Sequence, residues 1–214
     1  MVFSILTLFP EIFFPIFSSS IVGRAQKSNR ISIRLINIRD FATDTRKTVD
    51  DRPYGGSVGM ILKIDVLYSA LQASFIRNLR QRIILLDPAG KLFNQARAVK
   101  YTGYGHLILI CGHYEGIDQR INNFIDEKLS VGRYILTGGE IPAMIVADAV
   151  TRLIPGVLKK NAVQNESFSK TYKIEPPQYT RPLTFKGYKV PSVLLSGNHG
   201  KINLWQKKHS NKSF

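Results

Sequence analysis

The residues best suited to chemistry lie in one short stretch, residues 106–118, which reads HLILICGHYEGID. Its apolar residues 107–111 run directly into Gly112, which indicates a buried strand that ends in a tight turn. In open α/β sheets, ligands bind beyond the carboxyl ends of the strands. Glu115 stands between Gly112 and Gly116, where its carboxylate could accept a hydrogen bond from a sugar hydroxyl or an amine. The same residues also fit an ordinary turn with a solvated glutamate.

Two more glycine-bearing turns are predicted at strand ends. One covers residues 87–90, after the apolar run 83–86, and the other covers residues 132–139, around a short predicted strand at 134–136. Three such loops at neighbouring strand ends can form one pocket lined by backbone N–H and C=O groups, which suits a flat, nucleoside-like cofactor. No Walker sequence is present, and the Gly-x-Gly at residues 103–105 precedes a strand, so a dinucleotide-binding fold has little support.

Three other segments suit a phosphate or nucleic-acid ligand, and each also has a simpler interpretation. The loop at residues 50–60, DDRPYGGSVGM, is long enough to close over a ligand, or it is a surface turn. Arg152, at the end of an apolar helix, could hold a phosphate or a purine carbonyl, or it is a solvated helix-end arginine. The run PQYTRP at residues 177–182 could stack a base or stiffen a linker. The four histidines show no metal-ligand spacing, so no metal site is predicted.

The elements that position these residues alternate between strands and helices. Strands are predicted at residues 4–9, 31–38, 83–86, 107–111 and 134–136, and helices at residues 60–79 and 142–153. This alternation indicates an α/β fold with a mostly parallel sheet. We predict a catalytic domain at residues 1–158, a linker at 159–175, and a small basic helical domain at 176–214 with a helix around residues 202–206.

Charge and composition restrict the partners. The 214 residues carry a net charge of +15, of which +9 falls in residues 159–214. Such an excess indicates a polyanionic partner, usually nucleic acid, although a generally cationic proteome would also produce it. Cys111 is the only cysteine, so no disulfide is expected. Pro10, Glu11 and Pro15 interrupt the apolar N-terminal residues, so neither a signal peptide nor a membrane span is expected, and the cytoplasm is the expected location.

Taken together, these segments resemble the bacterial tRNA (guanine-N1)-methyltransferases of the SPOUT class, which modify guanosine 37 beside the anticodon. The matching segments occur in the family's order between residues 5 and about 205. They are TLFPE, VDDRPYGGSVGM, LLDPAGKLFNQ, LILICGHYEGIDQR, SVGRYILTGGEIPAM, DAVTRLIPGVL, ESF, PQYTRP and VPSVLLSGNH, followed by Trp205.

The resemblance implies a fold and partners that periodicity does not reveal. It implies a deep trefoil knot in the C-terminal part of the α/β domain, with S-adenosylmethionine bound in the knot. It also implies a homodimer, tRNA with guanosine at position 37 as substrate, and a small helical domain that helps to hold the tRNA. A Mg²⁺ requirement is associated with the family, and no pattern in this sequence predicts a site for it.

The resemblance also assigns residues to roles. Arg152 matches an arginine used on the target guanine, and Glu166 occupies the position of a proposed general base. Asp50 matches an acidic residue of the loop near the methyl donor, Tyr54 belongs to the same loop, and His113 adjoins the second cofactor loop. The cofactor site is implied to comprise Leu85, Leu86, Asp87, Pro88, Gly112, Tyr114, Glu115, Gly116, Val131, Gly132, Arg133, Tyr134, Ile135, Leu136, Gly138 and Gly139.

Five positions depart from the family pattern. Arg46 stands where histidine is usual, Ser57 replaces a glycine, and His113 replaces an arginine. Arg133 replaces an aspartate in the third cofactor loop, and Glu166 is one methylene longer than the usual aspartate. Two alternatives therefore stay open at this point. The chain could be an RNA-binding protein that has lost catalysis, or a SPOUT methyltransferase that acts on another RNA.

Overall fold

The computed structural model describes residues 1–159, 162–169 and 173–210. The chain divides into two compact units, Met1–Leu158 and Lys159–Phe214. The predicted linker and the predicted C-terminal domain both fall in the second unit, and their separation from each other stays a prediction. Parts of these two predicted segments, residues 160–161, 170–172 and 211–214, lie outside the described residues.

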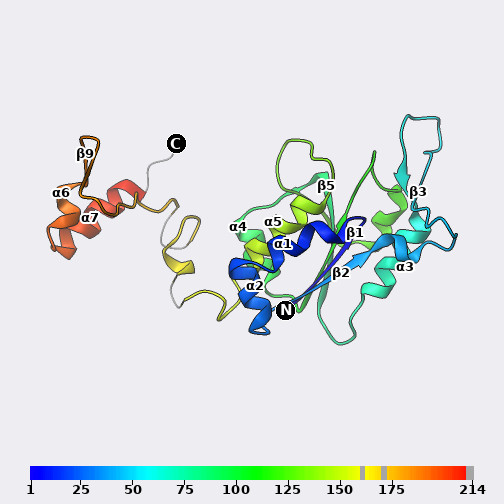
Figure 1. Cartoon of the computed structure of the whole chain (residues 1–214), viewed down its shortest axis with the longest axis horizontal. Coiled ribbons are helices and arrows are strands. Elements are labelled where there is room, and N and C mark those ends of the chain that lie inside the picture. Colours follow the sequence, from blue (N-terminus) through cyan, green and yellow to red (C-terminus); the bar gives the residue numbers. More distant parts are fainter. Residues whose placement is uncertain (160–161, 170–172, 211–214) are drawn as a thin grey trace. The chain divides into compact units, whose positions relative to one another are not determined.

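The first unit is built on a sheet of five parallel strands (Figure 1). The strand order is β2-β1-β6-β5-β7. The strands are β1 (Val2–Thr7), β2 (Ser32–Asn37), β5 (Gln81–Leu92), β6 (His106–Cys111) and β7 (Glu127–Ser130). The predicted α/β fold with a mostly parallel sheet is therefore confirmed.

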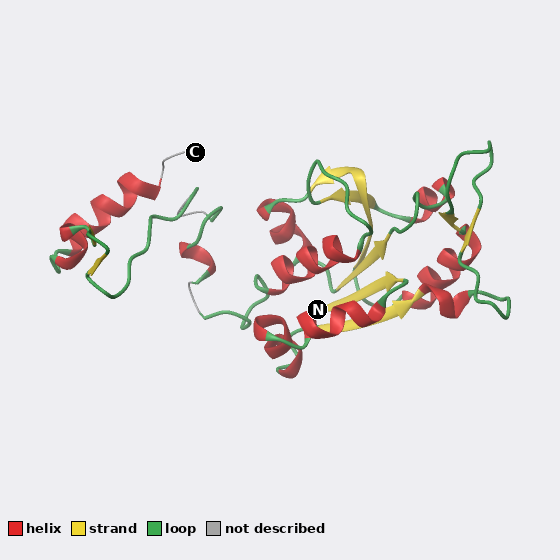
Figure 2. Cartoon of the chain, turned by 45° about the horizontal axis from the view of Figure 1, so that its top comes forward, coloured by secondary structure: helices red, strands yellow, loops and turns green. Residues whose placement is uncertain are grey.

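Helices cover both faces of the sheet (Figure 2). On β6, Leu109 and Cys111 pack into one hydrophobic cluster, whereas Ile108 and Ile110 pack into the other. A strand buried on both faces reads as a continuous apolar run, as residues 107–111 do. The first cluster holds residues of the 3-10 helix η1 (Pro10–Phe13), α1 (Phe14–Phe17), α2 (Ser20–Lys27), α4 (Gln95–Tyr101) and α5 (Glu140–Thr151). The second holds residues of α3 (Ile64–Ser74) and of the 3-10 helices η2 (Ile38–Phe41) and η3 (Gln119–Phe124).

A small hairpin positions the loop that was predicted to close over a ligand. Strand β3 (Asp50–Asp51) pairs antiparallel with β4 (Ile61–Leu62), so the residues between them form a projecting loop. The amide of Leu62 donates a 3.0 Å hydrogen bond to the carbonyl of Gly116. The hairpin is thereby attached to the turn that follows β6.

The prediction of a strand at residues 134–136 is wrong. These residues form a loop, and the strand of this region is β7, a few residues earlier. The apolar run misled because Tyr134 and Ile135 are 55% and 83% exposed and are not part of the core. Strand β7 was missed because its first residues, Glu127 and Lys128, are charged and are paired with Arg82, Arg97 and Asp87.

Two further element boundaries differ from prediction. Strand β5 continues past residue 86, but residues 87–90 loop out of its ladder with β7, because Leu86 and Lys91 both align with Leu129. A side chain at Gly90 would overlap the backbone of Leu129, so only glycine fits there. Helix α3 is shorter than the predicted 60–79, because Ile61 and Leu62 form strand β4 instead.

The second unit is small and has its own short elements. They are the 3-10 helix η4 (Val163–Asn165), a hairpin of β8 (Thr184–Phe185) with β9 (Tyr188–Lys189), α6 (Ser192–Leu195) and α7 (His199–Ser210). Helix α6 contacts α7, which contains the predicted helical residues 202–206. Among the described residues of the whole chain, no helix combines the length and apolar character that crossing a bilayer requires.

Candidate functional site

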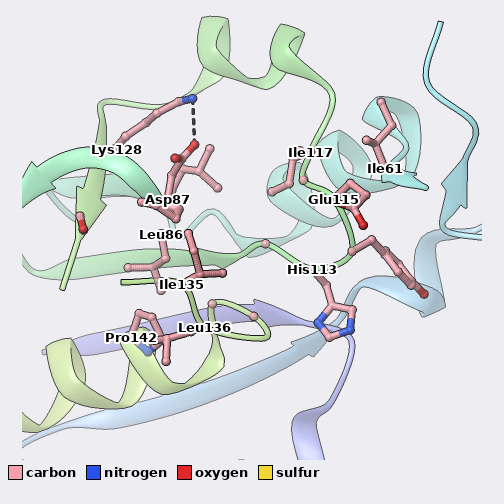
Figure 3. A pocket seen from close by; sticks show the side chains of 18 of the residues that line it. Ile61, Leu86, Asp87, His113, Glu115, Ile117, Lys128, Ile135, Leu136 and Pro142 are labelled. Carbon is pink, nitrogen blue, oxygen red and sulfur yellow. Dashed lines mark ion pairs between the residues drawn. The ribbon is translucent and has the colours of Figure 1, made fainter. Parts of the chain in front are cut away.

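A cavity of about 730 Å³ opens at the carboxyl ends of β5, β6 and β7 (Figure 3). Three loops form most of its wall: loop 1 (residues 85–88), loop 2 (residues 112–118) and loop 3 (residues 131–139). Figure 3 shows Ile135, Leu136 and Pro142 on one side and Ile61, Glu115 and Ile117 on another. Its position matches the general rule that ligands of parallel sheets bind beyond the strand ends.

The structure brings together nearly all the residues predicted to hold a cofactor. Every residue in that set except Arg133 lines the cavity, and Tyr54 and His113 line it too. Arg133 is exposed, so this departure from the family pattern places its charge outside the cavity wall. Asp50 lies on β3, outside the residues that line the cavity.

Loop 3 is fastened to the end of β6 by close backbone contact. The amide of Gly139 donates a 2.8 Å hydrogen bond to the carbonyl of Gly112. A Cβ atom on Gly139 would stand 2.6 Å from the Cα of Cys111, so a larger residue does not fit. At the other end of loop 3, the Ser130 hydroxyl donates a 2.9 Å hydrogen bond to the carbonyl of Gly132.

Loop 1 is held by charge and by a local turn. The Asp87 carboxylate pairs with the Lys128 ammonium at 2.9 Å, and both side chains are about one-quarter exposed (Figure 3). The other carboxylate oxygen of Asp87 accepts a 2.8 Å hydrogen bond from the amide of Ala89. These contacts fix the residues that leave the β5 ladder.

Loop 2 turns sharply and contacts the β3–β4 hairpin. Tyr114 and Gly116 have positive φ angles of 58° and 136°. The amide of Glu115 donates a 3.1 Å hydrogen bond to the carbonyl of Met60, and Gly59 leaves room for the Glu115 side chain. The Glu115 side chain thus stands exposed at the cavity wall, which fits both an acceptor for a ligand and a solvated glutamate in a turn.

A buried carboxylate that sequence analysis did not single out lies behind the cavity. Glu140 is 5% exposed and accepts a 2.9 Å hydrogen bond from the hydroxyl of Thr7. It is the first residue of α5, where the helix dipole favours negative charge. Burial raises the pKa of the Cys111 thiol, and the Glu140 charge adds to the effect, so Cys111 stays protonated and behaves as a small apolar residue.

Other wall residues were missed as well. Ile61, Ile117 and Lys128 line the cavity but belong to no predicted site. Lys128 could have been assigned to the cavity wall only from its ion pair with Asp87. That pairing cannot be predicted until the register of β5 and β7 is known. Glu140 could have been found from its position directly after two glycines at a helix start.

The two predicted catalytic residues do not line the cavity. Arg152 is the C-cap of α5, whereas Pro142, near the other end of that helix, lines the cavity. Helix α5 has 12 residues, and at 1.5 Å per residue it is about 18 Å long. Arg152 therefore lies about this distance from Glu140, at the other end of the helix. Glu166 belongs to the second unit. Among the described residues, no group of three His, Cys, Asp or Glu side chains could hold a metal ion, so the Mg²⁺ requirement associated with the family has no candidate ligand set there.

Comparison with known proteins gives a consistent result over the whole length. The family model described as tRNA (Guanine-1)-methyltransferase TrmD matches residues 1–213. A tRNA (guanine-N(1)-)-methyltransferase of Carboxydothermus hydrogenoformans is 52% identical over 208 residues, covering 96% of this chain and 81% of the relative. Proteins with the same name from Magnetococcus marinus and Metamycoplasma arthritidis are 49% and 47% identical, and the matches cover 97% of this chain in both cases and 84% and 89% of the relatives.

Proposed function

Because the chain belongs to the tRNA (guanine-1)-methyltransferase family, we propose that it transfers a methyl group from S-adenosylmethionine to N1 of guanosine 37 in tRNA. The observation that carries this proposal is the convergence of three separate segments on one cavity. Residues 85–88, 112–116 and 131–139, matched to the family's cofactor loops from sequence alone, meet at the same strand ends.

The cavity fits the methyl donor in size and lining. Pockets for ligands of this size enclose about 300–1,000 Å³ and combine apolar walls with a few directed polar groups. Ile135, Leu136 and Pro142 supply apolar surface for a purine ring, and the loop backbones supply donors and acceptors. Glu115 supplies a carboxylate for an amine or a ribose hydroxyl. When bound, S-adenosylmethionine supplies a methyl group on a positively charged sulfur.

The protein's part in the reaction is to make guanine N1 nucleophilic. N1 carries a proton, and its lone pair becomes available only when a base removes that proton. Glu166 is the proposed base, since a positioned carboxylate can accept the proton as the bond to carbon forms. Negative charge then develops on O6, and the Arg152 guanidinium is the proposed group that stabilises it. The pocket walls contribute by holding donor and acceptor in line.

We propose that the protein is a homodimer, and the location of Arg152 supports this proposal. Within the first unit, Arg152 and the cavity lie at opposite ends of α5, so a second copy of the chain is the proposed means of completing the site. Several apolar side chains on the helices that contribute to the first hydrophobic cluster are exposed to solvent. Ile12, Phe14 and Ile16 are 42–61% exposed, and Ile141 and Ile145 are spaced four apart on α5 and are 49% and 39% exposed. Such a surface is typical of an interface between subunits.

A trefoil knot is proposed for the segment from β5 to α5. Strand β7 lies at the edge of the sheet, whereas α5 packs on β6 and β1 near its middle. The intervening loop 3 must therefore cross back past the end of β6, which is where Gly139 touches Cys111 and Gly112. Knots are rare in proteins, and a cofactor pocket built from the crossing loops would give the proposed knot a function.

The second unit is proposed to hold the tRNA. Residues 159–214 carry a net charge of +9, and no aspartate or glutamate occurs after Glu175. Positive charge of this density binds the phosphate backbone through release of counterions. A tRNA substrate in turn supports a cytoplasmic location.

Methyl transfer from tritium-labelled S-adenosylmethionine tests the proposal. The acceptors are an unmodified tRNA transcript with guanosines at positions 36 and 37 and a matched transcript with adenosine at 37. We expect label only in the first transcript. Binding of the transcript without transfer would favour a non-catalytic RNA-binding protein. Equal labelling of both transcripts would favour a methyltransferase that acts at another site.

A further inference from the structure

The hairpin of β8 and β9 displays two aromatic rings on one face. Phe185 and Tyr188 are directly paired across the two strands, so their side chains point to the same side. Their exposed fractions are 62% and 82%. The Lys186 ammonium lies 5.7 Å from the centre of the Phe185 ring. The tip therefore combines two accessible aromatic surfaces with one positive charge.

The hairpin is short but well defined. Lys186 and Gly187 both have positive φ angles, 47° and 86°, which is the conformation of the two-residue turn that best matches the twist of paired strands. The amide of Val190 donates a 3.1 Å hydrogen bond to the carbonyl of Leu183, which extends the pairing beyond Thr184 and Lys189. In Figure 1 this hairpin projects from the pair formed by α6 and α7. The backbone that carries the two rings is thus well defined, and the helices of its own unit leave the rings exposed.

Charge indicates which kind of partner covers these rings. From residue 176 to the end, the chain has seven Lys or Arg residues and no Asp or Glu. A second copy of this chain, with its net charge of +15, would bring like charge to the hairpin. A polyanion brings opposite charge. Aromatic rings beside cationic side chains form the surface on which unpaired bases stack, since every base has a flat π face.

The geometry points to the β8–β9 hairpin as a stacking platform for unpaired bases of the tRNA anticodon loop. This inference rests on the proposed function, because it takes tRNA as the partner and adds the contact made. Unpaired bases are the fitting ligand because the faces of bases inside an A-form stem are already stacked on one another. Phe185 and Tyr188 would each accept a base face, and Lys186 would pair with the adjoining phosphate.

The test compares tRNA binding by the double variant Phe185→Ala/Tyr188→Ala with binding by Phe185→Tyr/Tyr188→Phe, which keeps both rings. Affinity for an unmodified tRNA transcript is measured by fluorescence anisotropy over a range of salt concentrations. Loss of one stacked base is worth roughly 5- to 150-fold in affinity, so the alanine variant should bind at least about fivefold more weakly. The slope of affinity against salt should not change, because no phosphate-binding cation is removed. The ring-keeping variant should bind like the unaltered protein.

Two controls separate stacking from other causes. Leu204→Ala removes an apolar side chain that is 69% exposed on α7 and should bind tRNA normally. An RNA duplex with the sequence of the anticodon stem but no loop should bind equally to the unaltered protein and to the double alanine variant. Equal loss of affinity for duplex and transcript would overturn the inference. So would normal tRNA binding by the alanine variant, or a change in its oligomeric state on size-exclusion chromatography.

Failure of this inference is distinguishable from failure of the proposed function. If the unaltered protein methylates tRNA and the alanine variant binds tRNA normally, the platform is wrong and the enzyme assignment stands. If the unaltered protein transfers no methyl group to guanosine-37 tRNA, the proposed function fails whatever the variant does.

Discussion

Gly139 and Gly112 are joined by a 2.8 Å hydrogen bond that ties the start of α5 to the end of β6, 27 residues earlier in the chain. The two backbones are so close that a Cβ atom on Gly139 would stand 2.6 Å from the Cα of Cys111 and 2.8 Å from the amide nitrogen of Gly112. The φ angle of Gly139 is −82°, which any residue adopts. Glycine is therefore needed here for close approach and not for an unusual backbone conformation.

Gly139→Ala should separate loop 3 from loop 2. Because the atoms in the way belong to backbone, the added methyl group cannot be accommodated by a side-chain movement. We expect a loss of about 2 kcal/mol in the free energy of unfolding, the usual scale of overpacking, together with weaker binding of S-adenosylmethionine. Urea unfolding and calorimetric titration measure the two effects. Gly103→Ala is the matched control, since its Cβ would meet only the Lys100 carbonyl oxygen, at 3.3 Å, which is a tight contact without overlap. Unchanged cofactor binding by Gly139→Ala would show that the contact between loop 3 and loop 2 does not shape the pocket.

Arg152→Ala should remove catalysis and leave the cofactor site intact. Arg152 is not among the residues that line the cavity, so calorimetric binding of S-adenosylmethionine should stay unchanged. Loss of a group that stabilises developing charge typically lowers the rate by roughly 100- to 1,000-fold. Single-turnover methyl transfer to tRNA measures this loss. Arg24→Ala, at an exposed arginine on α2, is the control for removing a positive charge. Normal methylation by Arg152→Ala would refute its assignment to the target guanine.

Glu166→Gln and Glu166→Asp should behave in opposite ways. Glutamine cannot accept the N1 proton, so methyl transfer should fall by roughly 100- to 10,000-fold, the usual contribution of a general base. Aspartate is the residue that the family pattern has at this position, and Glu166→Asp should keep most of the activity. Transfer is followed under single-turnover conditions, with tRNA binding measured in parallel. Normal transfer by Glu166→Gln would refute the assignment of Glu166 as the base, whereas equal loss in both variants, with binding retained, would indicate that basicity and side-chain length both matter.

The sequence was sufficient to predict four of the five strands of the sheet and most of the cavity wall. Strands β1, β2, β5 and β6 are apolar or alternating runs, and the loops after β5 and β6 are marked by glycine or proline. These signals are local, because burial on both faces requires apolar residues whatever the neighbouring strand is. Loop 3 was also predicted from its glycines, and the family motifs matched it to a cofactor loop, although its fold depends on contacts with the end of β6.

The missed features depend on contacts between segments that lie far apart in the chain. Strand β7 tolerates Glu127 because Arg82 on β5 and Arg97 on α4 each contact its carboxylate, at 2.9 and 2.8 Å. Burial alone would raise the pKa of Glu127, but these arginines lower it, so the charge is retained inside the fold. The hydrophobic pattern of residues 127–130 does not show that these ion pairs offset the burial of the Glu127 carboxylate. In the same way, the separation of Arg152 from the cavity follows from the length of α5 as folded, which motif order alone does not give.

His106 should make the stability of the fold depend on pH. It is fully buried at the start of β6, with Nδ1 2.7 Å from the Gln81 side-chain oxygen and Nε2 2.8 Å from the Ser4 hydroxyl. The Gln81 oxygen only accepts, so Nδ1 carries the proton and Nε2 accepts from Ser4. Burial, together with the charge of Arg34 on β2, lowers the pKa of His106 to about 4. The folded state therefore holds the ring neutral.

In the unfolded chain His106 binds a proton near pH 6.5, whereas in the folded protein it does so only near pH 4. The contribution of His106 to the free energy of unfolding is therefore complete above pH 6.5 and is lost as the pH falls towards 4. Linkage sets the loss at about 3 kcal/mol. Buried carboxylates also titrate in acid, so the measurement compares urea unfolding of the unaltered protein and of His106→Gln at pH 7.5, 6, 5 and 4. The difference in unfolding free energy between the two should shrink by about that amount across the range. His199→Gln, at an exposed histidine, should follow the unaltered protein. Parallel curves for the unaltered protein and His106→Gln would mean that His106 does not titrate differently on folding.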